Sequence, residues 1–219
     1  MKKQKSISQT IVEQPVLNNA IMMEAPHLVI IGSSCRNSGK TTLAAGLIEQ
    51  LKEKMHVIAL KITSIDGRSA SCPHGSKGCG ACSLSGVQFA LTEEICACGE
   101  KDTSRLLAAG AEKVFWLRCL KQALFSGFTF FQEQSPHNAV IICESNCLRE
   151  IVNPAVFIMI DNPAEIFKPS AKRVAALADI SIRYPWNENS ARRLFKQVED
   201  ALTQKNSGAS GCCPAPLVT

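Results

Sequence analysis

The stretch LVIIGSSCRNSGKTT at residues 28–42 decides the fold of this chain of 219 residues. It begins with a short apolar run that contains β-branched side chains and closes on a glycine, which predicts a buried strand at 28–32. The segment after it, TTLAAGLIEQLKEK, places leucines at four-residue spacing and predicts an amphipathic helix at 41–54. A loop of this composition between a strand and a helix is typical of a phosphate-binding loop.

The loop SCRNSGKTT at 34–42 contains the residue types that such a site needs. The start of a helix leaves backbone N–H groups unpaired and carries a positive partial charge, so it attracts phosphate oxygens. In this pattern Gly39 lets the backbone approach the phosphates, Lys40 contacts the β- and γ-phosphates, and Thr41 offers its hydroxyl to Mg²⁺. The alternative is an ordinary serine- and glycine-rich helix cap with an exposed lysine. The expected nucleotide contacts are Arg36, Asn37, Ser38, Gly39, Lys40, Thr41 and Thr42.

Ser34 occupies the position at which this loop pattern usually has its first glycine. A positive φ there would cost on the order of 1 kcal/mol, because the serine Cβ atom would crowd the backbone. The backbone conformation of Ser34 therefore decides whether this departure from the pattern strains the loop.

Predicted strands and helices alternate along the rest of the chain. Further strands are expected at 57–62, 113–117, 139–143, 155–160 and 179–182, and further helices at 103–109, 119–131, 164–177 with a kink or break at Pro169, and 189–202. This order predicts an α/β fold, a three-layer P-loop NTPase with a mostly parallel central sheet. We expect a nucleotide-binding domain at 27–204, a flexible N-terminal arm at 1–26 and a flexible, cysteine-containing tail at 205–219.

The composition excludes several classes of protein. Hydrophobic residues make up 46% and charged residues 20%, as in ordinary soluble domains, which argues against disorder and fibrous repeats. No apolar run reaches the ~18 residues of a membrane span, and the amino end has no apolar segment typical of a secretory signal. We therefore expect a cytoplasmic protein without a membrane partner. A net charge of +5 and 5% aromatic residues do not favour a nucleic-acid partner.

Eleven cysteines are an unusual feature of this sequence. Five of them fall in a stretch rich in glycine and serine at about 64–99, which we expect to be an insertion because it is too long for an ordinary loop. In a reducing compartment, clustered cysteines favour a metal site over disulfides, and their thiolates suit Zn²⁺ or an iron–sulfur cluster. A redox dithiol and unligated thiols in a mobile loop are the alternatives. The candidate metal ligands are Cys72, Cys79, Cys82, Cys96 and Cys98.

Carboxylates that follow predicted strands are candidates for a Mg²⁺ site beside Thr41. Mg²⁺ prefers oxygen ligands and keeps several waters, so a nearby carboxylate usually holds it through water. Glu144, which directly follows the strand expected at 139–143, is the first choice. Asp66, just past the strand at 57–62, is an alternative in a switch-like region. The other interpretation of each is a solvated loop carboxylate.

The string CRNSGKTTL resembles the phosphate loop of the MobB-like P-loop GTPases, the molybdopterin-guanine dinucleotide biosynthesis protein B family. The likeness extends to Lys61 at the end of a predicted strand, to GEKDTSRLLAAGAEKV at 99–114, and to the strand that ends in Glu144. It adds Asp102 as a third candidate near the Mg²⁺ site. The chain departs from the family at Ile62, where a histidine is common, at Ser145, where a glycine follows the glutamate, and in its cysteine-rich insertion.

The resemblance implies GTP binding, slow hydrolysis and service to a client enzyme, often as a homodimer. Together with the residues, it predicts a GTP- or ATP-binding accessory protein for metal-cofactor assembly, of which the molybdenum cofactor is one candidate. Lys40 and Glu144 are the expected catalytic residues, since an ammonium and Mg²⁺ neutralise charge on a transferred phosphoryl group. The alternatives are a small-molecule kinase or ATP-dependent ligase, and a metal or redox sensor with a vestigial nucleotide site.

Overall fold

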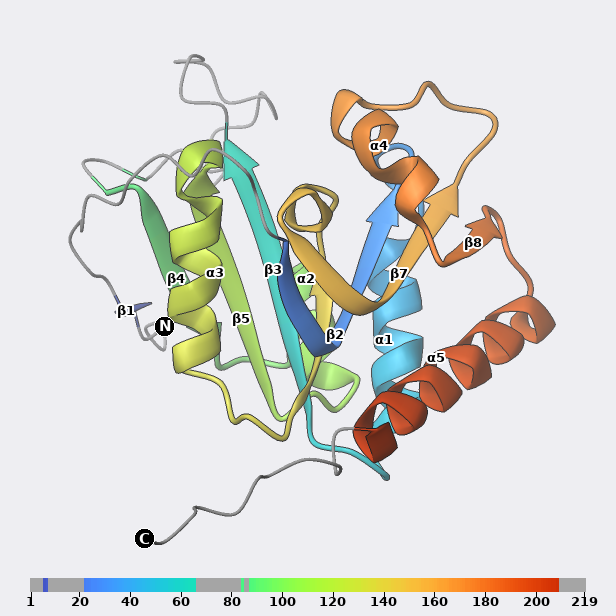
Figure 1. Cartoon of the computed structure of the whole chain (residues 1–219), viewed down its shortest axis with the longest axis horizontal. Helices are drawn as coiled ribbons and strands as arrows, with labels where there is room; N and C mark the ends of the chain where they lie inside the picture. The colour runs from blue at the N-terminus through green and yellow to red at the C-terminus, as the bar shows by residue number, and fades with distance from the viewer. Residues whose placement is uncertain (1–5, 8–21, 66–83, 85–86, 209–219) are drawn as a thin grey trace, which may run out of the picture.

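A computed structural model describes residues 6–7, 22–65, 84 and 87–208 of the chain (Figure 1). These residues form one sheet with the strand order β1-β4-β5-β3-β6-β2-β7-β8. The strands are β1 (Ser6–Ile7), β2 (Met23–Ser33), β3 (Val57–Ile65), β4 (Phe89–Glu94), β5 (Lys113–Leu120), β6 (Val140–Glu144), β7 (Val152–Asp161) and β8 (Ile180–Arg183). The helices are α1 (Lys40–Leu51), α2 (Asp102–Ala108), α3 (Leu124–Glu133), α4 (Pro169–Val174) and α5 (Glu188–Gly208).

The sheet is mostly parallel, as the alternation of strands and helices predicts. The strands from β5 across to β8 all pair in parallel, whereas β4 pairs antiparallel with β5 and β1 antiparallel with β4. Parallel neighbours need crossover connections, and the helices supply them while covering the faces of the sheet. The predicted α/β class with three layers is therefore confirmed.

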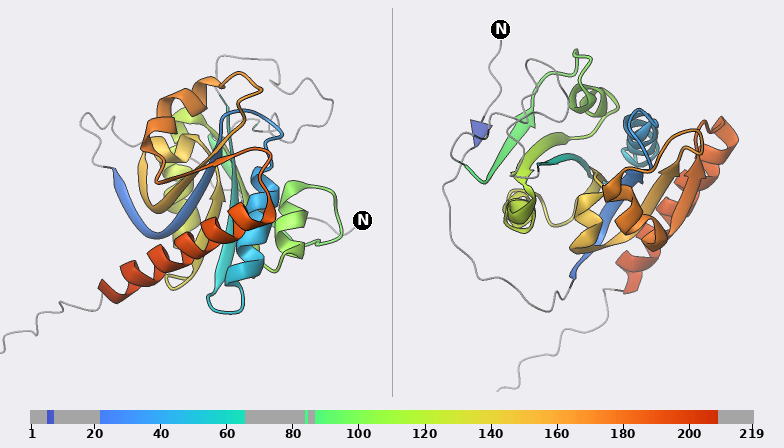
Figure 2. Two further views of the ribbon diagram at one scale, coloured as in Figure 1. Left: turned by 90° about the vertical axis from the view of Figure 1, so that its right-hand side faces the viewer. Right: turned by 90° about the horizontal axis from the view of Figure 1, so that it is seen from above.

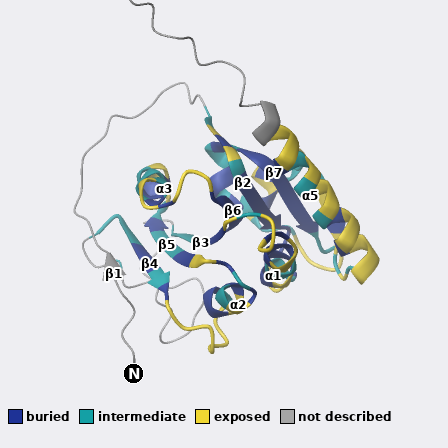
Figure 3. Cartoon of the chain, turned by 90° about the horizontal axis from the view of Figure 1, so that it is seen from below, coloured by how far each residue is buried: buried dark blue, intermediate teal, exposed yellow. Residues whose placement is uncertain are grey.

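Two apolar cores hold the three layers together. Because successive strand residues face opposite sides, Val29 and Ile31 of β2 pack with α1, α2 and α5, while Leu28 and Ile30 pack with α3 and α4. Figure 2 shows helices on both faces of the sheet, and Figure 3 shows buried residues on the strands and on the inner sides of the helices. The most central strands are apolar on both faces, as expected of a covered parallel sheet.

The ends of the predicted domain differ from the structure. The expected N-terminal arm ends at residue 26, but β2 begins at Met23 and pairs with β7 from there, so the last four residues of that arm belong to the sheet. At the other end α5 continues to Gly208, past the expected boundary at 204. Residues 8–21 and 209–219, which hold most of the arm and of the tail, lie outside the described part.

The predicted insertion at about 64–99 is partly sheet. β3 continues to Ile65, and β4 at Phe89–Glu94 pairs with β5. The sequence pattern missed β4 because its run FALTEE is short and stands between segments rich in glycine, serine and cysteine. Residues 66–83 and 85–86 lie outside the described part of the chain, and with them Asp66, Cys72, Cys79 and Cys82.

Two predicted helices begin later than expected. The segment expected as a helix at 119–131 starts as the end of β5, and α3 begins only at Leu124 after a 3₁₀ turn. The helix expected at 164–177 is wrong in its first part, because α4 begins at Pro169. Proline lacks a backbone N–H and is well suited to the first helical position, so Pro169 starts this helix instead of kinking it. The segment before it, 162–168, is a loop that reaches the phosphate loop.

Within the described residues, the helices are too short or too polar to cross a membrane.

Candidate functional site

A cavity of about 940 Å³ lies at the carboxyl ends of the central strands β2, β3 and β6. This edge is where open α/β sheets bind their ligands. Residues Arg36 to Thr42 of the predicted phosphate loop line the cavity, and Lys61, Asp102 and Glu144 line it from neighbouring strands and α2. The structure thus brings together all the described residues that the sequence assigned to nucleotide and Mg²⁺.

The phosphate loop turns by means of two residues in the left-handed region. Asn37 has φ of 53° and Gly39 has φ of 76°, directly before α1 begins at Lys40. A Cβ atom on Gly39 would collide with the ring of Trp186. Glycine is therefore required at this position both for its backbone angle and for the close approach of an aromatic ring.

Ser34 does not have a positive φ, so the strain considered for this position does not arise. Its side chain and backbone instead join the loop to the segment after β7. The N–H of Ser34 donates to the carbonyl oxygen of Ile160 at 2.8 Å, and its Oγ accepts a hydrogen bond from the N–H of Asn162 at 2.8 Å. The carbonyl oxygen of Ser34 accepts a hydrogen bond from the N–H of Lys168 at 2.9 Å.

Two lysine side chains converge on one hydroxyl group beneath the loop. Lys40 Nζ donates to Ser33 Oγ at 2.8 Å, and Lys168 Nζ donates to the same oxygen at 3.3 Å. Burial lowers the pKa of Lys40, while the carboxylate of Glu144 opposes that shift. Burial and the nearby charge of Lys40 lower the pKa of Lys168 to about 8. The site therefore concentrates positive charge where the pattern predicts phosphate.

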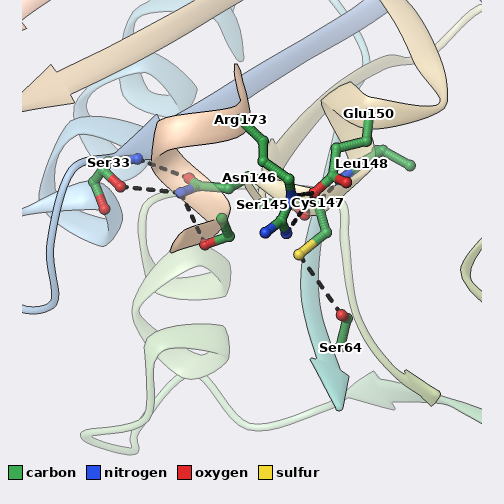
Figure 4. Close-up of polar contacts among 9 residues, drawn as sticks. Ser33, Ser64, Ser145, Asn146, Cys147, Leu148, Glu150 and Arg173 are labelled. Carbon is green, nitrogen blue, oxygen red and sulfur yellow. Dashed lines mark hydrogen bonds and ion pairs between the residues drawn. The ribbon is translucent and has the colours of Figure 1, made fainter. Parts of the chain in front are cut away.

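Asn146 holds the strand end from which the loop departs (Figure 4). Its Oδ1 accepts a hydrogen bond from the N–H of Ser33 at 2.9 Å, and its Nδ2 donates to the carbonyl oxygen of Ser33 at 3.0 Å. Asn146 is buried, and the absence of a side chain on Gly32 leaves room for it. Asn146 thus fixes the backbone of Ser33, whose hydroxyl oxygen accepts hydrogen bonds from both lysines.

Glu144 is a carboxylate buried at the bottom of the cavity. Its Oε1 has no hydrogen-bond partner among the described residues, and the residue is 4% exposed. Burial raises the pKa of Glu144, although Lys61 and a hydrogen bond with Thr41 oppose the shift. A buried oxygen without a partner is costly to the fold, which indicates a partner that the described part of the chain does not itself supply.

Asp102 lies on the other side of Thr41. Burial works against its ionisation, but a hydrogen-bonded ion pair with Lys61, together with a hydrogen bond from Thr41 and the charge of Arg105, holds the pKa of this carboxyl below its usual value. Arg105 also donates to Thr42 Oγ1 at 3.1 Å. Asp102 is therefore an ionised carboxylate at neutral pH, held near the start of α1.

These residues fit a Mg²⁺ ion. A hydroxyl at the start of α1, the buried Oε1 of Glu144 and an ionised Asp102 are hard oxygen donors of the kind that Mg²⁺ takes. Thr41 lowers the pKa of both carboxyl groups, so the three groups lie close together.

The described cysteines do not form a metal site. Cys96 and Cys98 are joined by a disulfide, and the described residues contain no group of three or more His, Cys, Asp and Glu side chains that could hold a metal ion. Cys35 is a buried free thiol inside the phosphate loop. Burial raises the pKa of Cys119 to about 12 and also raises that of Cys143, so both thiols stay protonated.

Three parts of the site were not predicted from the sequence. They are Asn146 after β6, Lys168 after β7, and the segment Tyr184–Trp186 after β8. Each lies close after a strand of the parallel sheet, so the rule that ligands bind at the carboxyl ends of strands is the signal that could have found them. Their residue types alone resemble ordinary loop residues.

Comparison of the chain with models of protein families, with curated proteins and with solved structures gives no match.

Proposed function

We propose that the chain binds the Mg²⁺ complex of GTP or ATP at the phosphate loop and hydrolyses it slowly. One observation carries this proposal: Lys40, Thr41 and Glu144 meet in one cavity, and Glu144 has a buried oxygen without a partner among the described residues. The ammonium suits the β- and γ-phosphates, and the two oxygen donors suit the metal ion that accompanies them.

The roles of the residues follow from their charges. The start of α1 and the backbone of Arg36–Thr42 would hold the phosphates, since the first N–H groups of a helix have no partner within the helix and attract an anion. Lys40 would neutralise charge that develops on the terminal phosphoryl group. Thr41 and Glu144 would hold Mg²⁺, Glu144 through a water molecule. The metal ion supplies further positive charge to the phosphate oxygens when bound.

Aromatic side chains at one end of the cavity suit the base of a nucleotide. Tyr184 and Trp186 both line the cavity and form an edge-to-face pair with ring centroids 5.5 Å apart. Trp186 also lies against Gly39, so this aromatic pair directly adjoins the phosphate loop. A planar base stacks favourably on such a surface whatever its identity, which fits a site that takes either purine.

Calorimetric titration of the full chain with Mg-GTP and Mg-ATP tests the proposal. We expect binding by the wild type, its loss in Lys40→Ala, and a weaker dependence on Mg²⁺ in Thr41→Ala. Lys54→Ala is the matched control, because Lys54 forms an exposed ion pair with Glu199 away from the cavity. If the wild type releases no heat with either nucleotide at millimolar concentration, the proposal is wrong. That result would favour the alternative of a metal or redox sensor with a vestigial nucleotide site.

The biological role that we propose is that of an accessory protein for metal-cofactor assembly, acting on a client enzyme. It is supported by the likeness of the loop, of Lys61 and of the segment around Asp102 to the MobB-like GTPases. A thiolate metal site in the region of Cys72–Cys98 belongs to the same proposal, and it requires that the Cys96–Cys98 disulfide be reduced.

A small-molecule kinase or ATP-dependent ligase is the second candidate. The cavity continues past the phosphate loop to Ser64, Ser145 and Cys147, and Ser64 Oγ donates to the sulfur of Cys147 at 3.6 Å (Figure 4). Such a polar extension offers room for an acceptor next to the terminal phosphate. Nucleotide turnover that depends on an added acceptor would favour this candidate over slow basal hydrolysis.

A further inference from the structure

The side chain of Lys168 starts from a fixed point on the phosphate loop. Its backbone N–H donates to the carbonyl oxygen of Ser34 at 2.9 Å, and the N–H of Asn162 at the other end of the same segment donates to Ser34 Oγ. Pro169 then begins α4 directly after it. Lys168 is therefore not a surface lysine on a loose loop, because its main chain is hydrogen-bonded to the loop that would hold phosphate.

The ammonium group of Lys168 contacts a neutral oxygen instead of a carboxylate. It shares the hydroxyl of Ser33 with Lys40, and that hydroxyl in turn donates to the carbonyl oxygen of Cys35 at 2.8 Å. Besides burial, the strongest influences on the pKa of Lys168 come from Lys40, the thiols of Cys147 and Cys35, and Arg36. Because Lys40 and Lys168 donate to the same hydroxyl oxygen, two partly buried cations lie close together there.

Other lysines of the chain have different partners: the partly buried Lys61 pairs with the carboxylate of Asp102, and the exposed Lys205 and Lys52 bond to backbone carbonyls. Lys205 Nζ donates to the carbonyl oxygens of Pro154 and Ala155, and Lys52 Nζ donates to the carbonyl oxygen of Ala109. Those contacts secure helix ends and strand ends with partially negative oxygens. Lys168, by contrast, lines the cavity and points at the hydroxyl already occupied by Lys40, an arrangement that suits an incoming anion.

We propose that Lys168 is a second phosphate-binding lysine that contacts the terminal phosphate of a nucleoside triphosphate, so that the site selects triphosphates over diphosphates. This inference rests on the proposed nucleotide site. Lys40 lies at the start of α1 and suits the β- and γ-phosphates, whereas Lys168 reaches the same place from the loop before α4. A γ-phosphate bound between the two ammonium groups would relieve their repulsion through its extra negative charge.

The test compares triphosphate and diphosphate binding by the full chain. Dissociation constants of Mg-GTP, Mg-GDP, Mg-ATP and Mg-ADP are measured by calorimetry for the wild type, Lys168→Met, Lys168→Arg and the control Lys52→Met. We expect Lys168→Met to weaken triphosphate binding about tenfold or more, as charge-assisted contacts to phosphate do, and to change diphosphate binding less than about threefold. Arginine at this position should restore much of the lost affinity, and Lys52→Met should change neither.

The outcomes separate the two proposals. The role of Lys168 is overturned if the wild type binds nucleotide and Lys168→Met loses no affinity, or loses affinity for triphosphates and diphosphates equally. The proposed nucleotide site is unaffected by that result. Failure of the wild type to bind any of the four nucleotides overturns both. Thermal melts of each variant show whether a loss of binding reflects unfolding. Should Lys168→Met not fold, the ratio of triphosphate to diphosphate affinity in Lys168→Arg decides, since a ratio near one contradicts the inference.

Discussion

Asn146 holds both backbone polar groups of Ser33, accepting a hydrogen bond from its N–H at 2.9 Å and donating one to its carbonyl oxygen at 3.0 Å. Asn146→Ala leaves these two buried groups without partners. We expect it to lower the free energy of unfolding by about 2–3 kcal/mol, measured by urea denaturation. Asn153→Ala, which removes an exposed hydrogen bond to Glu24, is the control and should stay within about 0.5 kcal/mol of the wild type. Equal effects of the two variants would contradict the structural role given to Asn146.

Glu144→Gln should stabilise the ligand-free fold at neutral pH. Burial raises the folded-state pKa of Glu144 above its ordinary 4.5, so keeping it ionised costs stability once the pH exceeds that value. The stability of the wild type relative to Glu144→Gln should therefore fall as the pH rises from about 4.5 toward neutrality. In this range the unfolded chain has lost the Glu144 proton, whereas the folded protein still retains it. Thermal melts over this pH range, without Mg²⁺ or nucleotide, measure the effect.

Glu94→Gln provides the contrast to that variant. Glu94 is also buried, but its Oε2 accepts a hydrogen bond from Thr103 Oγ1 at 2.8 Å and its Oε1 accepts one from the N–H of Cys96. The amide cannot accept at both positions, so we expect destabilisation of about 1 kcal/mol. Stabilisation by Glu94→Gln together with destabilisation by Glu144→Gln would contradict a buried Glu144 Oε1 without a partner in the ligand-free protein.

Gly39→Ala should impair both the fold and nucleotide binding. The positive φ of 76° costs an alanine roughly 1–2 kcal/mol, and the new Cβ atom meets the ring of Trp186. Combining the change with Trp186→Ala removes the collision but keeps the backbone cost. Gly39→Ala should therefore cost less stability in the Trp186→Ala background than in the wild type, as measured by a double-mutant cycle. Strict additivity of the two changes would show that the ring does not restrict this position.

Trp186 should report nucleotide binding by its fluorescence. The chain has two tryptophans, and Trp186 lines the cavity whereas Trp116 lies on β5 with its Nε1 donating to Thr63 Oγ1. We expect Mg-GTP or Mg-ATP to change the emission of Trp116→Phe, which retains Trp186, and to leave that of Trp186→Phe nearly unchanged. The reverse pattern would place the base away from Tyr184 and Trp186.

Metal binding by the cysteine-rich region should depend on the redox state. Cys96 and Cys98 form a disulfide in the structure and only their reduced thiolates can ligate Zn²⁺ or iron. Elemental analysis of protein purified anaerobically with reductant should find bound metal, and the double variant Cys96→Ser/Cys98→Ser should contain less. Metal-free wild-type protein with all thiols titratable would defeat the proposed metal site. Ala97→Ser is the matched control, because it adds a hydroxyl at an exposed position between the two cysteines and leaves both thiols in place.

The sequence predicted those parts of the fold whose signals are local. The loop SCRNSGKTT, Glu144 after an apolar strand and the parallel strands around them could be read from short runs, because strand–loop–helix transitions leave their pattern in adjacent residues. β4 escaped for the opposite reason. Its run FALTEE is short and stands between segments rich in glycine, serine and cysteine, and the strand is held by antiparallel pairing with β5.

The remainder of the site depends on strand order, which local patterns do not contain. β2 lies between β6 and β7, so residues following three different strands meet around the phosphate loop. Lys168 beside a proline is by itself indistinguishable from a solvated lysine before a helix. Asn146 likewise has no local signal, since its importance comes from the backbone of Ser33, more than a hundred positions away. Such residues become visible only once the sheet is assembled.

The hydrogen bonds at Ser34 also connect the interior of the site with the periphery of the molecule. They hold the segment 162–168 to the phosphate loop, and this segment carries Ile166, whose side chain is 87% exposed. A few main-chain atoms therefore separate the phosphate loop from an apolar side chain that is open to solvent.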